Sequence, residues 1–362
     1  MGLAIRQMVL EHAGKSSIDQ LRGFKTTCLF VLVLQIVLIV LLWAFVKLYP
    51  PSDDVFYFWL ALAVYCTSFN FAELYRQFYY MSSRQRHSLC FSAISFGSGA
   101  ILFLVFAATC VSNTLQFFAF WFLATGNLFY IVCTHFTLKK RKLNVGSSWA
   151  SALHLFHRYR KHGIPATGGM LVTWMQNQSV TPLLMFMFGP AMVGYYGIAR
   201  MIATPVNMVT TGLAKSALPQ IRKTFGIGGH NELNSAVRGY RQTSMQTVFF
   251  YFLIVGIGGA IAQFFDLVDV SNTLVAMLIA TGLVTCLSNY RFWISQYFVV
   301  RMQFKTLLRL AIFASCVTVS IMLIGGLLFN STLVVVAAPA FGELILIYVL
   351  SRLLVKFSES KM

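Results

Sequence analysis

The sequence predicts an all-α polytopic membrane protein of about ten transmembrane helices. We expect two parallel repeats (4 + 6) around a central cavity, with both termini cytoplasmic. Hydrophobic residues make up 58% of the 362 residues and charged residues only 10%, whereas a soluble domain carries about a quarter charged residues. Long apolar stretches recur, and both the basic residues and several short sequence matches follow the order of these stretches.

Each apolar stretch is long enough for a helix to cross the hydrocarbon core of a bilayer. The first is too long for the apolar part of a cleavable signal peptide, and it lacks a small-residue cleavage site. Taken in order, the predicted spans are residues 26–48, 55–79, 88–111, 114–136, 167–189, 191–214, 242–265, 272–299, 306–329 and 332–355.

Basic residues fall almost entirely on alternate connections, which orients the chain because cytoplasmic loops are rich in Lys and Arg. Of the 28 basic residues, 24 lie on the termini and connections that this rule assigns to the cytoplasm. The opposite side holds only Lys47 among the basic residues, together with four of the ten acidic residues. Because the positive charge is spread over six separate segments, it predicts membrane orientation and disfavours nucleic-acid binding.

Short internal matches predict two repeats, as is common in transporter folds. RGFKTT at 22–27 precedes the first span, and the similar RGYRQT at 238–243 precedes the seventh. RQFYYMSSRQRH at 76–87 follows the second span, and SQYFVVRMQFK at 295–305 follows the eighth. The two matches occur in the same order and at nearly the same offset along the chain. We therefore divide the chain into an N-terminal half (1–136), a linker (137–163) and a C-terminal half (164–362).

The first half is two spans shorter than the second, so the chain is predicted to lack a first helical hairpin. A misassigned start, a truncated gene and a genuine variant are all compatible with this prediction. The linker contains apolar residues at helical spacing (Trp149, Leu153 and Phe156) beside Arg158 and Arg160, which is typical of a helix lying on an anionic membrane surface.

Five ionisable side chains stand out as candidates inside the predicted spans, because such groups are costly at membrane depth and normally face a bundle interior or an aqueous cavity. Glu73 and Arg76 are three residues apart, so they can pair along one helix. Glu343 has no basic neighbour in its own span and must pair with another span or be protonated. Snorkelling and interhelical salt bridges are the structural alternatives to a binding role for all five: Glu73, Arg76, Arg200, Arg291 and Glu343.

The fifth span carries the consecutive amides Gln176, Asn177 and Gln178. Three consecutive residues cannot share one helix face. At least one of them is therefore expected to face a cavity, and interhelical hydrogen bonding is an equally weighted alternative. Pro182 and Pro205 are expected to kink the fifth and sixth spans.

The sequence contains no set of residues typical of an enzyme active site. We found no paired-carboxylate, triad or cofactor motif, and the seven cysteines lie in or beside apolar runs without a CxxC pair. The pair His154 and His157 is a weak metal motif because no carboxylate or cysteine accompanies it. We therefore predict a non-enzyme that has no cofactor and no metal.

Residues 163–223 resemble the seventh and eighth helices of polysaccharide-unit flippases. This O-antigen (Wzx-type) branch belongs to the multidrug/oligosaccharidyl-lipid/polysaccharide (MOP) exporter superfamily. The resemblance rests on a small-residue turn at Gly189–Gly194, a VGxYxxA run at Val193–Ala199, and a closing Pro219 followed by Arg222 and Lys223. It implies two six-helix halves around a central cavity and alternating access. The chain departs from the family by one hairpin, and by amides where many relatives have an acidic residue near Asn177 or Gln178.

The resemblance implies that the chain flips a lipid-linked oligosaccharide, such as an O-antigen unit of lipopolysaccharide, across the bacterial inner membrane. Buried arginines suit its pyrophosphate, and Gln, Asn and aromatic faces such as Tyr196 suit sugar rings. Expected partners are this lipid-linked oligosaccharide, membrane lipids, and a polysaccharide polymerase and glycosyltransferases. A cation-coupled drug or metabolite exporter, using Glu73 or Glu343, is the first alternative, and a non-transporting remnant is the second.

Overall fold

The computed structural model describes residues 16–48, 53–82, 84–109, 115–139, 149–264 and 271–359. Predictions that fall on residues 1–15, including the expected remnant of the missing hairpin, lie outside the described residues. The same is true of the basic run at 140–142 in the predicted linker.

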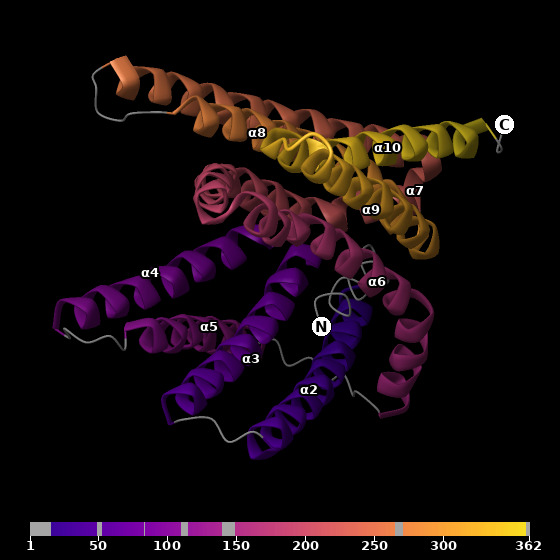
Figure 1. The fold of residues 1–362 in the computed structure, drawn as a ribbon. Helices are drawn as coiled ribbons and strands as arrows, with labels where there is room; N and C mark the ends of the chain where they lie inside the picture. Colours follow the sequence, from indigo (N-terminus) through magenta and orange to yellow (C-terminus); the bar gives the residue numbers. More distant parts are fainter. Residues whose placement is uncertain are drawn as a thin grey trace. The chain divides into compact units, whose positions relative to one another are not determined.

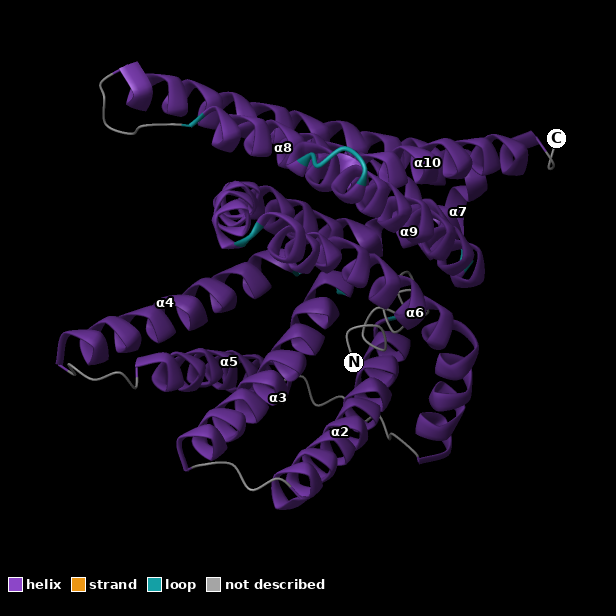
Figure 2. Ribbon diagram, in the orientation of Figure 1, coloured by secondary structure: helices purple, strands orange, loops and turns teal. Residues whose placement is uncertain are grey.

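Every regular element in the described residues is an α-helix (Figures 1 and 2). Serine caps begin two of them: the side chain of Ser16 accepts a hydrogen bond from the backbone of Asp19, and Ser271 does the same for Leu274. The helices are α2 (Ser17–Leu48), α3 (Asp53–Met81), α4 (Gln85–Thr109), α5 (Leu115–Lys139), α6 (Trp149–Phe188), α7 (Pro190–Phe264), α8 (Asn272–Val300), α9 (Phe304–Leu327) and α10 (Thr332–Glu359).

Within the described residues, five helical stretches are long and apolar enough to cross a membrane: Asp19–Val37, Glu232–Ile261, Asn272–Val300, Phe304–Leu327 and Thr332–Lys356. They match the first, seventh, eighth, ninth and tenth predicted spans. The other five predicted spans lie in α3, α4, α5, α6 and the first part of α7, which are helical as expected. The cytoplasmic placement of the termini stays a prediction.

Two predicted connections are helical and continue into the spans that follow them. The helix expected in the linker from Trp149 runs without a break into the fifth span, so that α6 extends over 40 residues. The predicted loop 215–241 is also helical and joins the sixth and seventh spans into α7, which is 75 residues long. Polar residues do not by themselves end a helix, and the helix of the second segment continues through Pro219 and the glycines Gly226, Gly228 and Gly229. The turn after α6 is at Gly189, whose φ of 82° is the left-handed conformation that glycine adopts without strain.

Helix α7 folds back on itself. A straight helix of its length would extend about 110 Å, yet residues that are far apart along α7 are in contact. The hydroxyl of Tyr251 donates to the backbone oxygen of Ile202 at 2.6 Å, although 49 residues separate them. The hydroxyl of Tyr240 also donates to the side chain of Gln220. The reversal therefore lies between Gln220 and Tyr240, and two antiparallel limbs take the places of the two predicted spans (Figure 1).

The chain packs as two compact units, residues 1–161 and 162–362. In the N-terminal unit, the ring of Phe24 on α2 lies 5.0 Å from that of Tyr75 and 4.6 Å from that of Phe78, both on α3. In the C-terminal unit, a core forms where five helices meet and includes Leu184 of α6, Tyr196 of α7, Met277 of α8, Met322 of α9 and Val335 of α10. The central cavity expected between the halves stays a prediction.

The two units contain matching helices. Helix α3 spans Asp53–Met81 and α8 spans Asn272–Val300, so each has 29 residues and the two are offset equally at both ends. The start of α9 at Phe304 follows the start of α4 at Gln85 by the same offset. In both units the first helix of the trio packs against the third, α3 against α5 and α8 against α10.

Backbone contacts in the turns repeat with the helices. The amide of Arg84 donates to the carbonyl of Tyr79 at 2.9 Å, and the amide of Gln303 donates to that of Phe298, also at 2.9 Å. These two pairs are related by the same offset as the helices, and they lie in the two sequence stretches that predicted the repeat. Within the described residues, α3–α5 and α8–α10 are therefore structural equivalents. The full arrangement of four and six spans stays a prediction.

Candidate functional site

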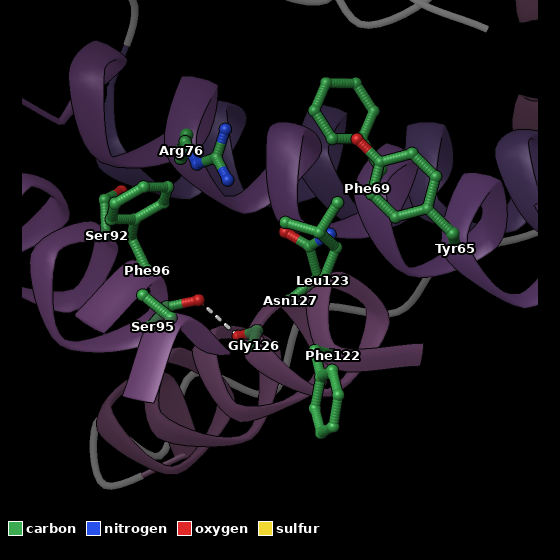
Figure 3. A pocket seen from close by; sticks show the side chains of 11 residues that line it. Tyr65, Phe69, Arg76, Ser92, Ser95, Phe96, Phe122, Leu123, Gly126 and Asn127 are labelled. Atoms are coloured by element: carbon green, nitrogen blue, oxygen red, sulfur yellow. Dashed lines mark hydrogen bonds between the residues drawn. The ribbon is translucent and has the colours of Figure 1, made fainter. Parts of the chain in front are cut away.

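A cavity of about 400 Å³ lies inside the N-terminal unit, between α3, α4 and α5 (Figure 3). Its volume falls within the roughly 300–1,000 Å³ that small-molecule sites occupy. Aromatic rings from all three helices line it: Tyr65 and Phe69 from α3, Phe96 from α4 and Phe122 from α5. Its polar lining consists of Arg76, Ser92, Ser95 and Asn127.

Among the described residues that line this cavity, Arg76 is the only charged one. Its Nη1 lies 3.2 Å from a carboxylate oxygen of Glu73, which confirms the pairing expected from their spacing. The other carboxylate oxygen of Glu73 accepts from Gln77 at 3.0 Å. The guanidinium also lies over the ring of Tyr130, 5.3 Å from its centre. Glu73 thus engages only part of the guanidinium.

The Nε of Arg76 is buried and has no hydrogen-bond partner among the described residues. A buried donor without an acceptor is costly, and such groups in native structures indicate water, an ion or a ligand. The side chain as a whole is 22% exposed and lines the cavity, while Nε itself is buried. This combination makes Arg76 a candidate anion-binding residue.

The floor of the cavity is formed by close packing of α4 on α5. The hydroxyl of Ser95 donates to the backbone oxygen of Gly126 (Figure 3). A Cβ atom at Gly126 would lie 2.7 Å from the backbone oxygen of Ser95, which is too close for any real contact. Small residues at helix contacts in membranes allow this approach.

We expect the substitution Gly126→Ala to separate α4 from α5 and to destabilise the N-terminal unit by about 1–3 kcal/mol, the usual cost of overpacking. Gly97→Ala is the matched control, because nothing lies within 4 Å of a Cβ atom at Gly97. Both changes gain the same helix propensity, so the difference in thermal midpoint in detergent isolates the contact. Equal midpoints would show that the floor is not tightly packed.

In the C-terminal unit, Arg291 of α8 forms an ion pair with Glu343 of α10. For Glu343 the sequence left two possibilities, a partner on another span or a protonated side chain, and the structure pairs it with Arg291. The side chain of Glu343 is 3% exposed and that of Arg291 is 17% exposed, so the pair is largely desolvated. This is the interhelical salt bridge that we considered as the structural alternative.

The amide of Gln176 also connects helices. Its Nε2 donates to Thr318 at 3.1 Å, and its Oε1 accepts from Ser315 at 2.7 Å, both on α9. Gly342 of α10 allows this contact, because a Cβ atom there would collide with the hydroxyl of Thr318. Gln176 therefore forms interhelical hydrogen bonds, the alternative weighted equally with a cavity role.

Arg200 of α7 donates to the side-chain oxygen of Gln178 on α6 at 2.9 Å. Both residues are partly buried, as is Asn177 between the two glutamines. Tyr196 is only 9% exposed and packs in the apolar core, which leaves little of its ring for a sugar. The structure thus supplies a neutral partner for Arg200, and the substrate roles of these residues stay predictions.

The predicted site residues fall into separate groups. Glu73 and Arg76 belong to the cavity of the N-terminal unit, whereas Arg291 with Glu343, Arg200 with Gln178, and Gln176 with α9 belong to the C-terminal unit. Sequence reasoning missed Tyr65, Phe69 and Asn127, which line the cavity, and Gln77, which follows Glu73 by one helical turn. Only the spacing of Gln77 could have suggested its role. The described residues contain no group of three metal-ligating side chains.

No protein-family model and no curated protein matches this sequence. Its fold does match solved structures. A multidrug-resistance MATE-family transporter of the MOP superfamily, in its outward-facing conformation, has a TM-score of 0.79 and 13% identity, covering 100% of this chain and 84% of that chain. A MATE structure in the straight conformation has a TM-score of 0.77 and 14% identity, and one in the bent conformation 0.72 and 13%. Both matches cover 99% of this chain and 84% of the other.

The chain therefore has the fold of the MATE transporters of the MOP superfamily. At 12–15% identity the likeness establishes the fold alone. It agrees with the superfamily that residues 163–223 suggested, but does not single out the polysaccharide-unit flippases within it.

Proposed function

We propose that this chain is a multi-pass transporter of the bacterial inner membrane that flips a lipid-linked oligosaccharide by alternating access. The observation that carries the proposal is Arg76, with its buried and unpartnered Nε at the wall of an aromatic cavity. The MATE-like fold supports the transport part of the proposal, and the chemistry of the cavity supports the class of cargo.

An anionic headgroup suits Arg76 because a planar guanidinium binds phosphate oxygens through parallel, charge-assisted hydrogen bonds. Glu73 engages one edge of the guanidinium, which leaves Nε for a second acceptor. In this low-dielectric setting such hydrogen bonds are stronger than in water. A pyrophosphate that links a sugar to its lipid supplies the required oxygens.

The rest of the cavity suits a ring-shaped apolar or amphipathic group. Tyr65 and Phe69 form a tilted pair with ring centres 5.9 Å apart, and Phe96 and Phe122 line the cavity from the other two helices. Asn127 and the two serines offer hydrogen bonds to hydroxyl groups. A sugar presents both apolar faces and hydroxyls, so both types of lining find partners. A polysaccharide polymerase and glycosyltransferases are the expected partner proteins.

Export of drugs or metabolites coupled to a cation gradient is the second candidate, since a multidrug-resistance transporter shares the fold. Such coupling needs an intramembrane carboxylate, and Glu73 and Glu343 are available. Each of them is paired with an arginine, and of the Glu73–Arg76 pair only Arg76 lines the cavity, where a cationic drug would meet the guanidinium. The electrostatics of the cavity therefore favour an anionic cargo.

The test is transport by the purified full chain in lipid vesicles. We expect a fluorescent pyrophosphate-linked oligosaccharide lipid to become accessible to a membrane-impermeant quencher in vesicles that contain the chain, and not in vesicles with heat-denatured protein. A lipophilic fluorescent cation under a proton or sodium gradient serves as the second cargo. Transport of the cation alone would replace our proposal by the exporter, and transport of neither would favour a non-transporting remnant.

A further inference from the structure

The second limb of α7 packs antiparallel to α8, and their contact brings two arginines beside an aromatic ring. The hydroxyl of Ser244 donates to the side-chain oxygen of Asn289 at 3.1 Å. One turn away, the guanidinium of Arg241 lies over the ring of Tyr290, 4.7 Å from its centre. Arg238 precedes Arg241 by three residues, so the two arginines are neighbours on the helix surface. Arg241 and Tyr290 are partly buried, and Arg238 is exposed.

These arginines lie at the level where the membrane-spanning part of α8 ends. A helix needs about 20 residues to cross the hydrocarbon core, and counted from Asn272, the first residue of α8, this length ends beside Tyr290. Tyrosine is enriched at that boundary. Leu283 lies two turns nearer the membrane centre on the same face of α8 and is 51% exposed. A phospholipid whose chains cover Leu283 therefore has its phosphate at the level of the two arginines.

The two arginines have no counter-charge among the described residues. Neither takes part in an ion pair there. Glu232, the nearest described acidic residue along α7, is exposed and lies six residues before Arg238, whereas side chains that meet on a helix surface are three or four residues apart. Like charges at the spacing of Arg238 and Arg241 repel each other, and an anion bound between them would relieve that repulsion.

The equivalent position of the N-terminal unit does contain a counter-charge. The two copies of the repeated motif align Arg22 with Arg238. Arg22 lies 4.0 Å from a carboxylate oxygen of Asp19 in the preceding turn. At the same offset Asp19 corresponds to Ser235, which is neutral and exposed. The C-terminal unit thus has the arginine without the acidic partner, which favours binding of an external anion at this unit.

We propose that Arg238 and Arg241 bind the phosphate of an anionic phospholipid from the leaflet that the basic loops assign to the cytoplasm. Anionic lipids give that leaflet its negative surface potential, and a guanidinium binds phosphate oxygens through charge-assisted hydrogen bonds. Tyr290 holds Arg241 at the headgroup level, and the acyl chains lie along Leu283. The exposed apolar surface beside the arginines favours a lipid over a soluble anion, and the inference holds whatever the cargo is.

The test is the thermal midpoint of the full chain in an uncharged detergent with added phosphatidylglycerol or phosphatidylcholine. A ligand that binds the native state raises the midpoint by an amount that grows with its affinity, so we expect the larger rise with phosphatidylglycerol. Arg241→Gln should weaken the apparent affinity roughly tenfold, the loss of one charge-assisted hydrogen bond. Arg309→Gln should keep the wild-type response, because Arg309 is an exposed arginine on α9.

A second variant introduces the counter-charge of the other unit. Ser235→Asp supplies the partner that Asp19 provides for Arg22, so phosphatidylglycerol should bind at least about twofold more weakly. Ser235→Asn is the matched control, since asparagine has nearly the shape of aspartate without its charge, and it should bind like the wild type. Each midpoint is compared with that of the same variant without lipid, so a change in basal stability is not counted as binding.

A second measurement locates the lipid. The seven native cysteines are replaced, and a fluorophore at Leu283→Cys should be quenched at least about twofold more by spin-labelled phosphatidylglycerol than by spin-labelled phosphatidylcholine. Phe250 lies two and a half turns beyond Arg241, on the opposite face of the second limb, and is 58% exposed. At Phe250→Cys the two lipids should therefore quench equally.

Equal responses to the two phospholipids, or wild-type binding by both Arg241→Gln and Ser235→Asp, would overturn the proposal. Inorganic pyrophosphate should not raise the midpoint, and a rise equal to that with phosphatidylglycerol would assign the arginines to a soluble anion. A rise with the pyrophosphate-linked oligosaccharide lipid alone would assign them to the cargo and refute the phospholipid. None of these outcomes depends on transport, so they are separate from the test of the proposed function.

Discussion

Replacing Arg291 by methionine is expected to destabilise the C-terminal unit by about 3–5 kcal/mol, the cost of leaving a buried charge without its partner. The carboxylate left behind belongs to Glu343, which is 3% exposed and has almost no access to water. The measurement is the thermal midpoint, together with the monodisperse fraction, of protein extracted in detergent. Arg309→Met is the matched control, because Arg309 is an exposed arginine of the same unit.

The double variant Arg291→Met/Glu343→Leu should recover most of this loss. Apolar residues of similar volume often replace a buried ion pair without a stability cost, and a double-mutant cycle then isolates the coupling between the two positions. Glu343→Gln should fall between wild type and Arg291→Met, since an amide can still accept from the guanidinium. A neutral Arg291→Met, or a double variant as unstable as the worse single variant, would contradict the structural role.

Replacing Arg76 by alanine should slow flipping of the pyrophosphate-linked oligosaccharide lipid at least about tenfold, because a charge-assisted hydrogen bond contributes roughly 1.5–3 kcal/mol. Arg76→Lys should retain part of the activity, since lysine keeps the charge but lacks the planar set of donors. The assay is the vesicle experiment with the impermeant quencher. Arg86→Ala serves as the control, as Arg86 is an exposed arginine of the same unit.

Glu73, the counter-ion of Arg76, can be substituted to give the opposite effect, tighter binding of the anionic lipid. Glu73→Gln removes the carboxylate that competes with the cargo for Nη1 of Arg76, so the apparent KM for the anionic lipid should fall. Both variants must keep the wild-type thermal midpoint for the interpretation to hold. Unchanged KM in Glu73→Gln, together with normal flipping by Arg76→Ala, would remove Arg76 from the binding site.

Sequence reasoning predicted local pairings better than long-range ones. Glu73 and Arg76 share one helix, so their spacing alone brings them within reach. The two equivalent turns, after α3 and after α8, were also predictable, because similar residues form the same backbone hydrogen bond in each. Helical connections were harder, since a charged segment such as 215–241 can be a loop or a helix, and sequence hydropathy does not distinguish them.

The helical class, the positions of the apolar spans and the internal repeat could be predicted from the amino-acid sequence, because hydropathy and repeated motifs are properties of the order of residues. The partner of each buried polar group depends on tertiary packing: Glu343 pairs with Arg291, Gln176 bonds to α9, and Arg200 bonds to Gln178. The same packing places Arg76 beside an aromatic cavity. These outcomes depend on how helices distant in sequence pack side by side, and no local pattern encodes that packing.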